Sequence, residues 1–282
     1  MRVACLFVLT ATLLIAPPSA AAPPTYKDVL IKDVPHVRQK PDFCGEACAE
    51  MYLRKLGHAV TQDLVFDASG LDPVLGRGCY TAELNTALRK LGFRTGDVWY
   101  RLDSGHSAAQ LEDQWKALHA DLLRGVPSIV CMHYSDRPDP TEHFRLVLGY
   151  RAEGDEVIFH EPAEDGGAYR KMPRSQFLKL WPLTQGQNKS VAIRLRLEPG
   201  KIVAPAPSRG FTQADYAQHI MELKKKLPPR DGFTIVVQAP FVVVGDERPA
   251  IVRQRATDTV KFAVDRLKRD FFAKDPDEIL DI

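Results

Sequence analysis

The chain has 282 residues, of which 45% are hydrophobic and 26% charged, and its formal net charge is +2. These proportions are typical of a globular protein with one large domain or two modest ones. The balanced charge indicates no strongly acidic or basic partner, and the sequence has no basic stripe of the kind that binds nucleic acids.

The N-terminus has the pattern of a secretory signal peptide, which we place at residues 1–22. Met1 and Arg2 precede the apolar run CLFVLTATLLIA, and small residues follow around Ala20. The run is too short to cross a bilayer, and we expect no integral membrane span elsewhere. The mature protein is therefore expected to be periplasmic or secreted.

The first domain is predicted to cover residues 26–199, with helices before strands. Apolar residues at helical spacing predict helices over residues 44–56, 81–91 and 107–123. Runs rich in Val, Ile and aromatic residues predict strands over residues 128–134, 144–150, 156–160 and 191–197. This order favours an α+β fold in which helices pack on an antiparallel sheet.

A second unit is predicted after a linker at residues 200–210, which contains APAPSRG. Residues 211–282 read as a small α/β C-terminal unit. Its expected elements are a lysine-rich helix at 212–227, strands within 233–244, and a long amphipathic helix at 249–272. The final EILDI reads as the start of another strand. The unit is thus either small or cut short in this sequence.

Cys44 is the candidate nucleophile. Gln39 stands five residues before it, Gly45 follows it, and an amphipathic helical pattern then begins. A helix N-terminus is expected to lower the pKa of a thiol there, and an upstream amide can hold an oxyanion beside the backbone N–H of Cys44. A lone cysteine in an exported chain is more often buried or disulfide-bonded, but these neighbours favour a nucleophile.

His143 is the candidate general base. It leads directly into the apolar strand HFRLVLGY, so its side chain can face a cleft while the following residues fill the core. His133 is the rival, at the end of SIVCMHY, and His36 and His160 are less favoured.

Glu161 is the candidate third residue, which would accept a hydrogen bond from the second ring nitrogen of His143. It follows the strand VIFHEP, the next strand after the one that His143 begins. Adjacent antiparallel strands would bring the two side chains together. Asp155, Glu164 and Asp165 remain alternatives.

The remaining cysteines suggest a disulfide bond. Removal of the signal peptide takes away Cys5, and an oxidising compartment favours pairing of spare thiols. If Cys44 stays free, Cys48 and Cys79 are the predicted pair, and Cys131 is expected to behave as a small buried apolar residue. No Cys-x-x-Cys or His-Glu-x-x-His spacing occurs, so we predict no metal or other cofactor.

The order of these motifs resembles that of a known family. VPHVRQ, CGEACAEMYLRKLG, HFRLVLGY, a strand ending in EP and SQFLKLW are similar to the bacteriocin-leader-processing (double-glycine) peptidases, and more closely to their stand-alone relatives. The resemblance implies a papain-like cysteine peptidase fold with Cys44 as nucleophile, His143 as base and Gln39 in the oxyanion hole. The family usually has Asp where this chain has Glu161.

These features predict an exported cysteine peptidase that hydrolyses peptide bonds in a peptide or protein substrate. A phytochelatin-synthase-like acyltransferase is one alternative, because thioester chemistry is common to both. A peptide-binding module that no longer cleaves is the other. No feature of the sequence indicates which oligomeric state the protein adopts.

Overall fold

The computed structural model describes residues 26–184, 189–198, 210–228, 232–272 and 274–282. The predicted signal peptide and all but the last residue of the predicted linker lie outside the described residues.

An eight-stranded sheet forms the centre of the larger part of the molecule, and its paired strands run antiparallel. The path of the sheet is β2-β8-β3-β4-β5-β6, with β1 beside β4 and β7 beside β8. The strands are β1 (Val29–Leu30), β2 (Trp99–Leu102), β3 (Ser128–His133), β4 (Glu142–Arg151), β5 (Glu156–His160), β6 (Arg170–Pro173), β7 (Leu183–Thr184) and β8 (Ser190–Leu195).

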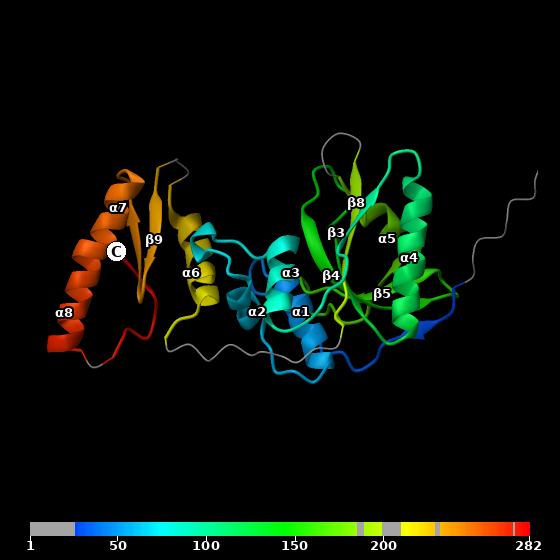
Figure 1. Cartoon of the computed structure of the whole chain (residues 1–282), viewed down its shortest axis with the longest axis horizontal. Helices are drawn as coiled ribbons and strands as arrows, with labels where there is room; N and C mark the ends of the chain where they lie inside the picture. The colour runs from blue at the N-terminus through cyan, green and yellow to red at the C-terminus, as the bar shows by residue number, and fades with distance from the viewer. Residues whose placement is uncertain (1–25, 185–188, 199–209, 229–231, 273) are drawn as a thin grey trace, which may run out of the picture.

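Helices cover both faces of this sheet (Figure 1). On one side lie α1 (Cys44–Lys55), α2 (Gln62–Ser69) and α3 (Thr81–Lys90), and on the other α4 (Ser107–Leu123) and α5 (Arg174–Leu180). A 3-10 turn, η1 (Pro73–Leu75), precedes α3. The predicted α+β fold, with helices on an antiparallel sheet, is therefore confirmed.

The central strands are buried along almost their whole length, because helices cover both faces of the sheet. Every residue of β3 except the last is buried, as are the eight residues of β4 from His143 to Tyr150. Strands covered on both faces read as continuous apolar runs, as SIVCM does. A charged residue inside such a run is unusual, because burying a charge costs free energy unless the charge is paired.

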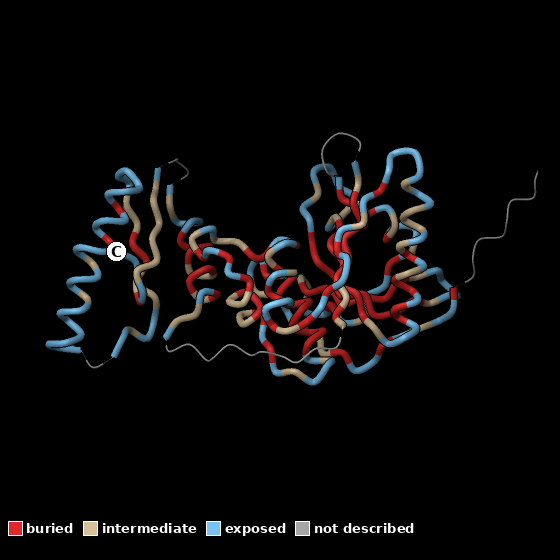
Figure 2. Tube along the Cα trace, viewed as in Figure 1, coloured by how far each residue is buried: buried red, intermediate tan, exposed pale blue. Residues whose placement is uncertain are grey.

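The C-terminal residues form a three-stranded sheet in the order β11-β10-β9 with a broken helix against it. Its elements are β9 (Thr234–Gln238), β10 (Phe241–Gly245), α7 (Pro249–Arg255), a π segment η2 (Ala256–Lys261), α8 (Phe262–Asp270) and β11 (Leu280–Asp281). Only the first half of the predicted amphipathic helix buries its apolar face. Val252 and Ala256 are buried, whereas α8 buries no residue and Leu267 is 45% exposed (Figure 2).

Helix α6 (Gln213–Lys226) lies between the two sheets (Figure 1) and takes part in two hydrophobic clusters. Ala214, Ala217 and Met221 join the main core, while Tyr216 and Ile220 pack with Val242 of β10. Lys224 also donates hydrogen bonds to the carbonyls of Val74 and Leu75. The helix thus fastens the C-terminal sheet to the main part. No described helix has the length and apolarity needed to span a membrane.

Candidate active site

Cys44 is the first residue of α1, directly after a tight turn. Asp42 in that turn has φ of 62°, a left-handed conformation that Asp tolerates better than most residues. Its carboxylate accepts a hydrogen bond of 2.9 Å from the backbone N of Gly78. A Cβ at Gly78 would lie 1.9 Å from the carbonyl oxygen of Asp42, so only glycine permits this approach. The turn before Cys44 is therefore fixed to the loop before α3.

Glu46 adds a second link between α1 and the same loop. Its Oε1 accepts from the backbone N of Cys79 at 2.7 Å, while its Oε2 is buried without a partner in the described protein. Burial raises the pKa of Glu46 to about 7, despite the hydrogen bond from Cys79, which acts in the opposite direction. A carboxyl group with a raised pKa thus lies two residues after the candidate nucleophile.

The segment VPHVRQ runs beside residues 160–162 and is joined to them by ring and backbone hydrogen bonds. The bonds are His160 Nε2 to the carbonyl of Val34 (3.1 Å), His36 Nε2 to the carbonyl of Glu161 (2.9 Å), Arg38 to the carbonyl of Pro162 (3.1 Å), and Gln39 N to the carbonyl of Pro162 (2.9 Å). This pairing brings Gln39 next to the segment that carries Glu161. The rings of His36 and His160 thus join the two backbone segments to each other.

His143 and Glu161 meet as predicted. The register of β4 and β5 pairs Leu146 with His160, so Glu161 continues alongside the start of β4. Nε2 of His143 lies 2.5 Å from Oε1 of Glu161, and both side chains are buried. An ionised carboxylate can only accept, so Nε2 of His143 donates to Glu161 and Nδ1 is the ring nitrogen that does not face this carboxylate.

Arg145 is a site residue that the sequence interpretation missed. Its Nε donates to Oε2 of Glu161 at 2.7 Å, and the pair is buried. Burial alone would raise the pKa of Glu161, but the hydrogen bond and charge of His143 and the charge of Arg145 outweigh it and lower the pKa. The sequence does contain a clue to Arg145, because it is a charged residue in an otherwise apolar strand. It stands two positions after His143, and this spacing places both side chains on one face of the strand.

The Cys44 thiol lies against the backbone of Phe144, the residue that follows His143. The expected low thiol pKa is wrong for this structure. Burial raises the pKa of Cys44 to about 12, and the charges of Glu46 and Asp42 act in the same direction. Backbone hydrogen bonds from Phe144 and Gly45 favour the thiolate, but they do not offset the loss of water around a half-buried sulfur.

The rival residues have other partners. Burial lowers the pKa of His160 to about 4, and its ring bridges two backbone groups, which is a structural role. His133 offers its carbonyl to Arg145. The three alternative carboxylates pair elsewhere: Asp155 with Tyr150 and Arg174, Glu164 with Arg170, and Asp165 with Arg38.

The predicted disulfide between Cys48 and Cys79 is wrong, because Cys44, Cys48, Cys79 and Cys131 are all free. The backbone N of Cys79 donates a hydrogen bond to Glu46, which lies in the first turn of α1. Cys48 lies further along that helix and is fully buried. Cys131 is buried as predicted.

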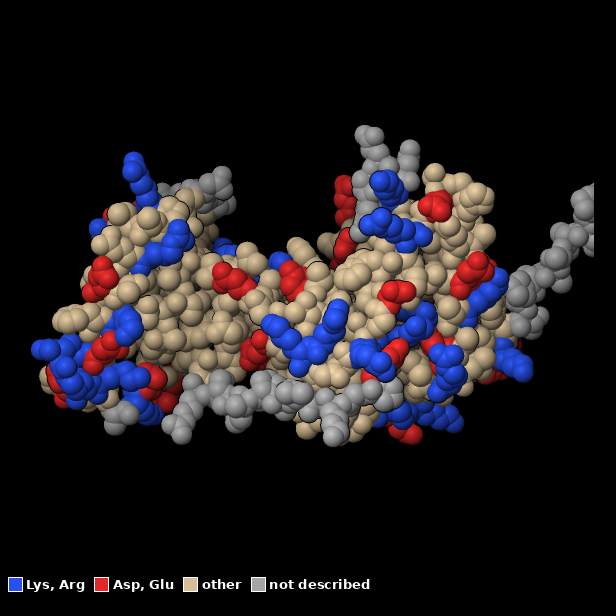
Figure 3. Space-filling model, in the orientation of Figure 1, with Lys and Arg blue, Asp and Glu red and all other residues tan. Residues whose placement is uncertain are grey.

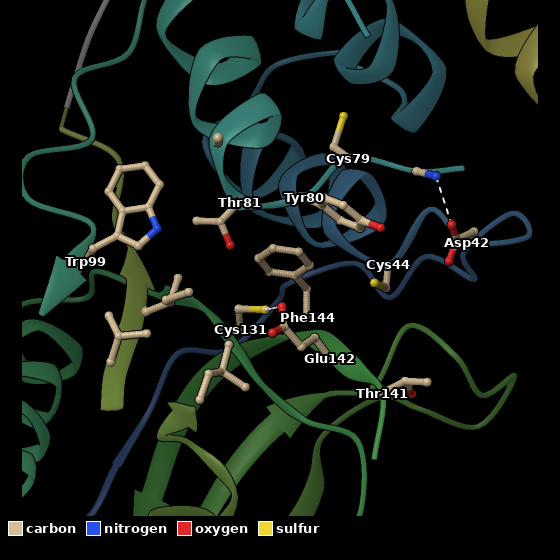
Figure 4. A pocket seen from close by; sticks show the side chains of 15 residues that line it. Asp42, Cys44, Cys79, Tyr80, Thr81, Trp99, Cys131, Thr141, Glu142 and Phe144 are labelled. Atoms are coloured by element: carbon tan, nitrogen blue, oxygen red, sulfur yellow. Dashed lines mark hydrogen bonds between the residues drawn. The ribbon is translucent and has the colours of Figure 1, made fainter. Parts of the chain in front are cut away.

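A cavity of about 670 Å³ opens beside the Cys44 thiol (Figure 4). It lies between the loop before α3 and the central strands, and its far end is apolar. The side chains that line it include those of Asp42, Cys44, Tyr80, Thr81, Trp99, Cys131, Glu142, Phe144, Leu183 and Ile193. The candidate nucleophile therefore faces a space large enough for a substrate side chain.

No group of metal-binding side chains occurs among the residues that the structure describes. On the face seen in Figure 3, Lys and Arg are interspersed with Asp and Glu, without a continuous patch of one sign.

Comparison with known proteins gives one family. The profile of the Peptidase_C39 like family matches residues 31–189, which is more than half of the chain. No curated protein matches.

Two solved structures are weakly similar. A double glycine motif protease from an AMS/PCAT transporter, in complex with the leader peptide, has 16% identity over 60% of this chain and 99% of its own, with a TM-score of 0.36. The peptidase domain of Streptococcus ComA, a bi-functional ABC transporter involved in a quorum sensing pathway, has 16% identity over 56% and 96%, with a TM-score of 0.37.

Proposed function

Because the chain belongs to the Peptidase_C39 like family, and is thus a cysteine peptidase by family, we propose that it hydrolyses peptide bonds at Cys44. His143 is the base in this proposal, Glu161 orients its ring, and Gln39 contributes to the oxyanion hole. The observation that carries the proposal is the hydrogen bond of 2.5 Å between His143 and Glu161, immediately next to the residue whose backbone contacts the Cys44 thiol.

In the proposed reaction His143 removes the Cys44 proton through Nδ1 as the sulfur attacks the peptide carbonyl. The imidazolium is stabilised by ionised Glu161 on its other nitrogen. It then gives the proton to the leaving amine, and water hydrolyses the thioester. Burial raises the pKa of Cys44, which favours transfer of the proton as the sulfur attacks over formation of a thiolate beforehand.

Gln39 is proposed to donate its side-chain amide N–H to the oxyanion, beside the backbone N–H of Cys44. Its Oε1 is buried without a hydrogen-bond partner in the described protein. An orphaned buried amide is costly and therefore calls for a partner, and rotation of the amide exchanges its oxygen and nitrogen. This supports a role for the amide when substrate is bound.

Replacement of Gln39 by alanine should lower kcat by about a hundredfold or more, because one oxyanion donor is lost. The binding of substrate should change much less. Steady-state kinetics on a cleavable peptide measure both quantities. Equal kcat in the Gln39→Ala variant and the unaltered protein would remove Gln39 from the oxyanion hole.

Thiol chemistry tests the site directly. A peptide with a thiol-reactive carbonyl group should label Cys44, and the His143→Ala variant should label far more slowly because the base is gone. Iodoacetamide, which bypasses the base, should react about tenfold faster for each pH unit up to the high pKa of the thiol. Mass spectrometry of the labelled peptide identifies the site. Equally fast labelling of Cys44 by the peptide in the His143→Ala variant and in the unaltered protein would contradict the proposed pair.

We also propose that the protein is exported and acts on peptides outside the cytoplasm. The charged, apolar and small-residue order of residues 1–22 supports this. A mature N-terminus close to Ala20, found by N-terminal sequencing, would support cleavage of a signal peptide.

A further inference from the structure

Arg145 carries a buried positive charge in the middle of an apolar strand. Its side chain is 6% exposed, and its neighbours along β4 are Phe144 and Leu146. Removing two charges from water is expensive, and replacing a buried ion pair by apolar residues of similar volume is often neutral or stabilising. Stability alone therefore does not account for an arginine here.

The guanidinium of Arg145 holds three groups at once. Nε donates to Oε2 of Glu161 at 2.7 Å, while the two terminal nitrogens donate to the carbonyls of His133 at 3.3 Å and Tyr134 at 3.0 Å. A planar fork fixes the directions of these bonds, which a lysine ammonium cannot do. The end of β3 and the carboxylate after β5 are thereby tied to one rigid group.

Two of these three groups flank the His143 ring. Glu161 accepts from Nε2 of His143 through its other oxygen. Tyr134 meets the imidazole edge-to-face, with ring centroids 4.9 Å apart and an interplanar angle of 83°. The ring is thus oriented from two directions, and both neighbours are held by Arg145.

We propose that Arg145 is a positioning residue of the catalytic site, which holds Glu161 and Tyr134 so that the His143 ring keeps Nε2 on the carboxylate and Nδ1 available to Cys44. The inference rests on the proposed function for the role of His143 as base. Glu161 has one more rotatable bond than an aspartate, and a second oxygen fixed by Arg145 removes that freedom. The arginine therefore makes the longer acid usable as an orienting group.

The test compares Arg145→Met and Arg145→Lys with a matched control, Arg194→Met. Arg194 is also buried, and it pairs with Asp121 at 2.7 Å, where it contacts none of the proposed catalytic residues. In Arg145→Met, kcat should fall at least about tenfold with KM within about twofold, because the base is misplaced while the cavity is unchanged. Arg145→Lys should recover only part of the loss. Arg194→Met should lose stability and keep its kcat.

A second measurement is independent of peptide hydrolysis. Imidazole ¹⁵N NMR should find the proton of His143 fixed on Nε2 in the unaltered protein and shared between both nitrogens in Arg145→Met. Arg194→Met should leave these signals in place. If the unaltered protein cleaves no peptide, the proposed function fails, and the ring signals still decide the role of Arg145.

Loss of folding is covered by Arg145→Lys, which keeps a positive charge beside Glu161 and leaves no unpaired buried charge. We expect this variant to fold, with an intermediate kcat and partly mixed ring signals, because a lysine cannot fix the directions of the three bonds. Unchanged ring signals and kcat in a folded Arg145 variant would overturn the proposal. An equal change in Arg194→Met would do the same, because the effect would then be a general one of buried arginines.

Discussion

Replacement of Cys44 by alanine is expected to abolish peptide hydrolysis and to leave the fold intact. Removing a nucleophile costs at least about ten-thousandfold in kcat, because the remaining groups only bind and polarise the substrate. The side chain is half-buried and small, so the free energy of unfolding should change by about 1 kcal/mol or less. Kinetics together with a denaturant titration measure both effects.

Cys131 provides the matched control for this experiment. It lines the same cavity and is also a free thiol, but it has no proposed chemical role. Cys131→Ala should retain most of the activity. Substantial hydrolysis by Cys44→Ala would show that another group performs the attack, and the proposed mechanism would have to be abandoned.

Replacement of Glu161 by alanine is expected to damage both stability and activity. It leaves Arg145 buried without a counter-charge, which costs about 3–5 kcal/mol in the free energy of unfolding. It also releases the His143 ring from its acceptor, and loss of the orienting acid in such a site lowers kcat by about ten-thousandfold. Thermal unfolding and steady-state kinetics provide the two readouts.

The pH dependence of stability gives a further signature of Glu161. Its pKa is lower in the folded protein than in the unfolded chain, so its contribution to stability is present above the unfolded pKa of about 4.3. That contribution is lost as the pH falls through the lower, folded value. The unaltered protein should therefore lose stability in acid more steeply than Glu161→Ala does.

Glu164 is the control for the loss of a carboxylate in the same turn. It pairs with Arg170 on the surface, where both side chains are about half-exposed, and such pairs contribute little. Glu164→Ala should change the free energy of unfolding by about 0.5 kcal/mol or less. If Glu164→Ala and Glu161→Ala have equal effects, the buried pair has no special importance.

Local signals accounted for much of the fold. The helices at Cys44, Thr81 and Ser107 and the four predicted strands were visible as runs of regular spacing. Helix α2 was missed although Thr61 caps it and Gly70 ends it in a left-handed conformation. The disulfide was wrong because pairing depends on the distance between two sulfurs, which cysteine counts do not contain.

The candidate site, like the fold, could be predicted from the sequence only in part. Cys44, His143 and Glu161 stand at or next to the ends of predicted elements, where side chains can face a cleft, and Gln39 is indicated by its place five residues before Cys44. Arg145 and the high pKa of Cys44 depend on what surrounds each group in space. Desolvation and charge pairing arise from atoms far apart in the chain, so no local pattern reports them.

The sequence by itself determined three of the helices, the central strands of the main sheet, the order of the motifs and the types of residue that can perform thiol chemistry. These follow from spacing along the chain, because helices and strands repeat at fixed periods. Only the tertiary structure decided that Glu161 lies between His143 and Arg145, that Gly78 is locked to the turn before Cys44, and that the four cysteines it describes stay free. Each depends on the register between β4 and β5 or on the packing of α1, which are set by contacts distant in sequence.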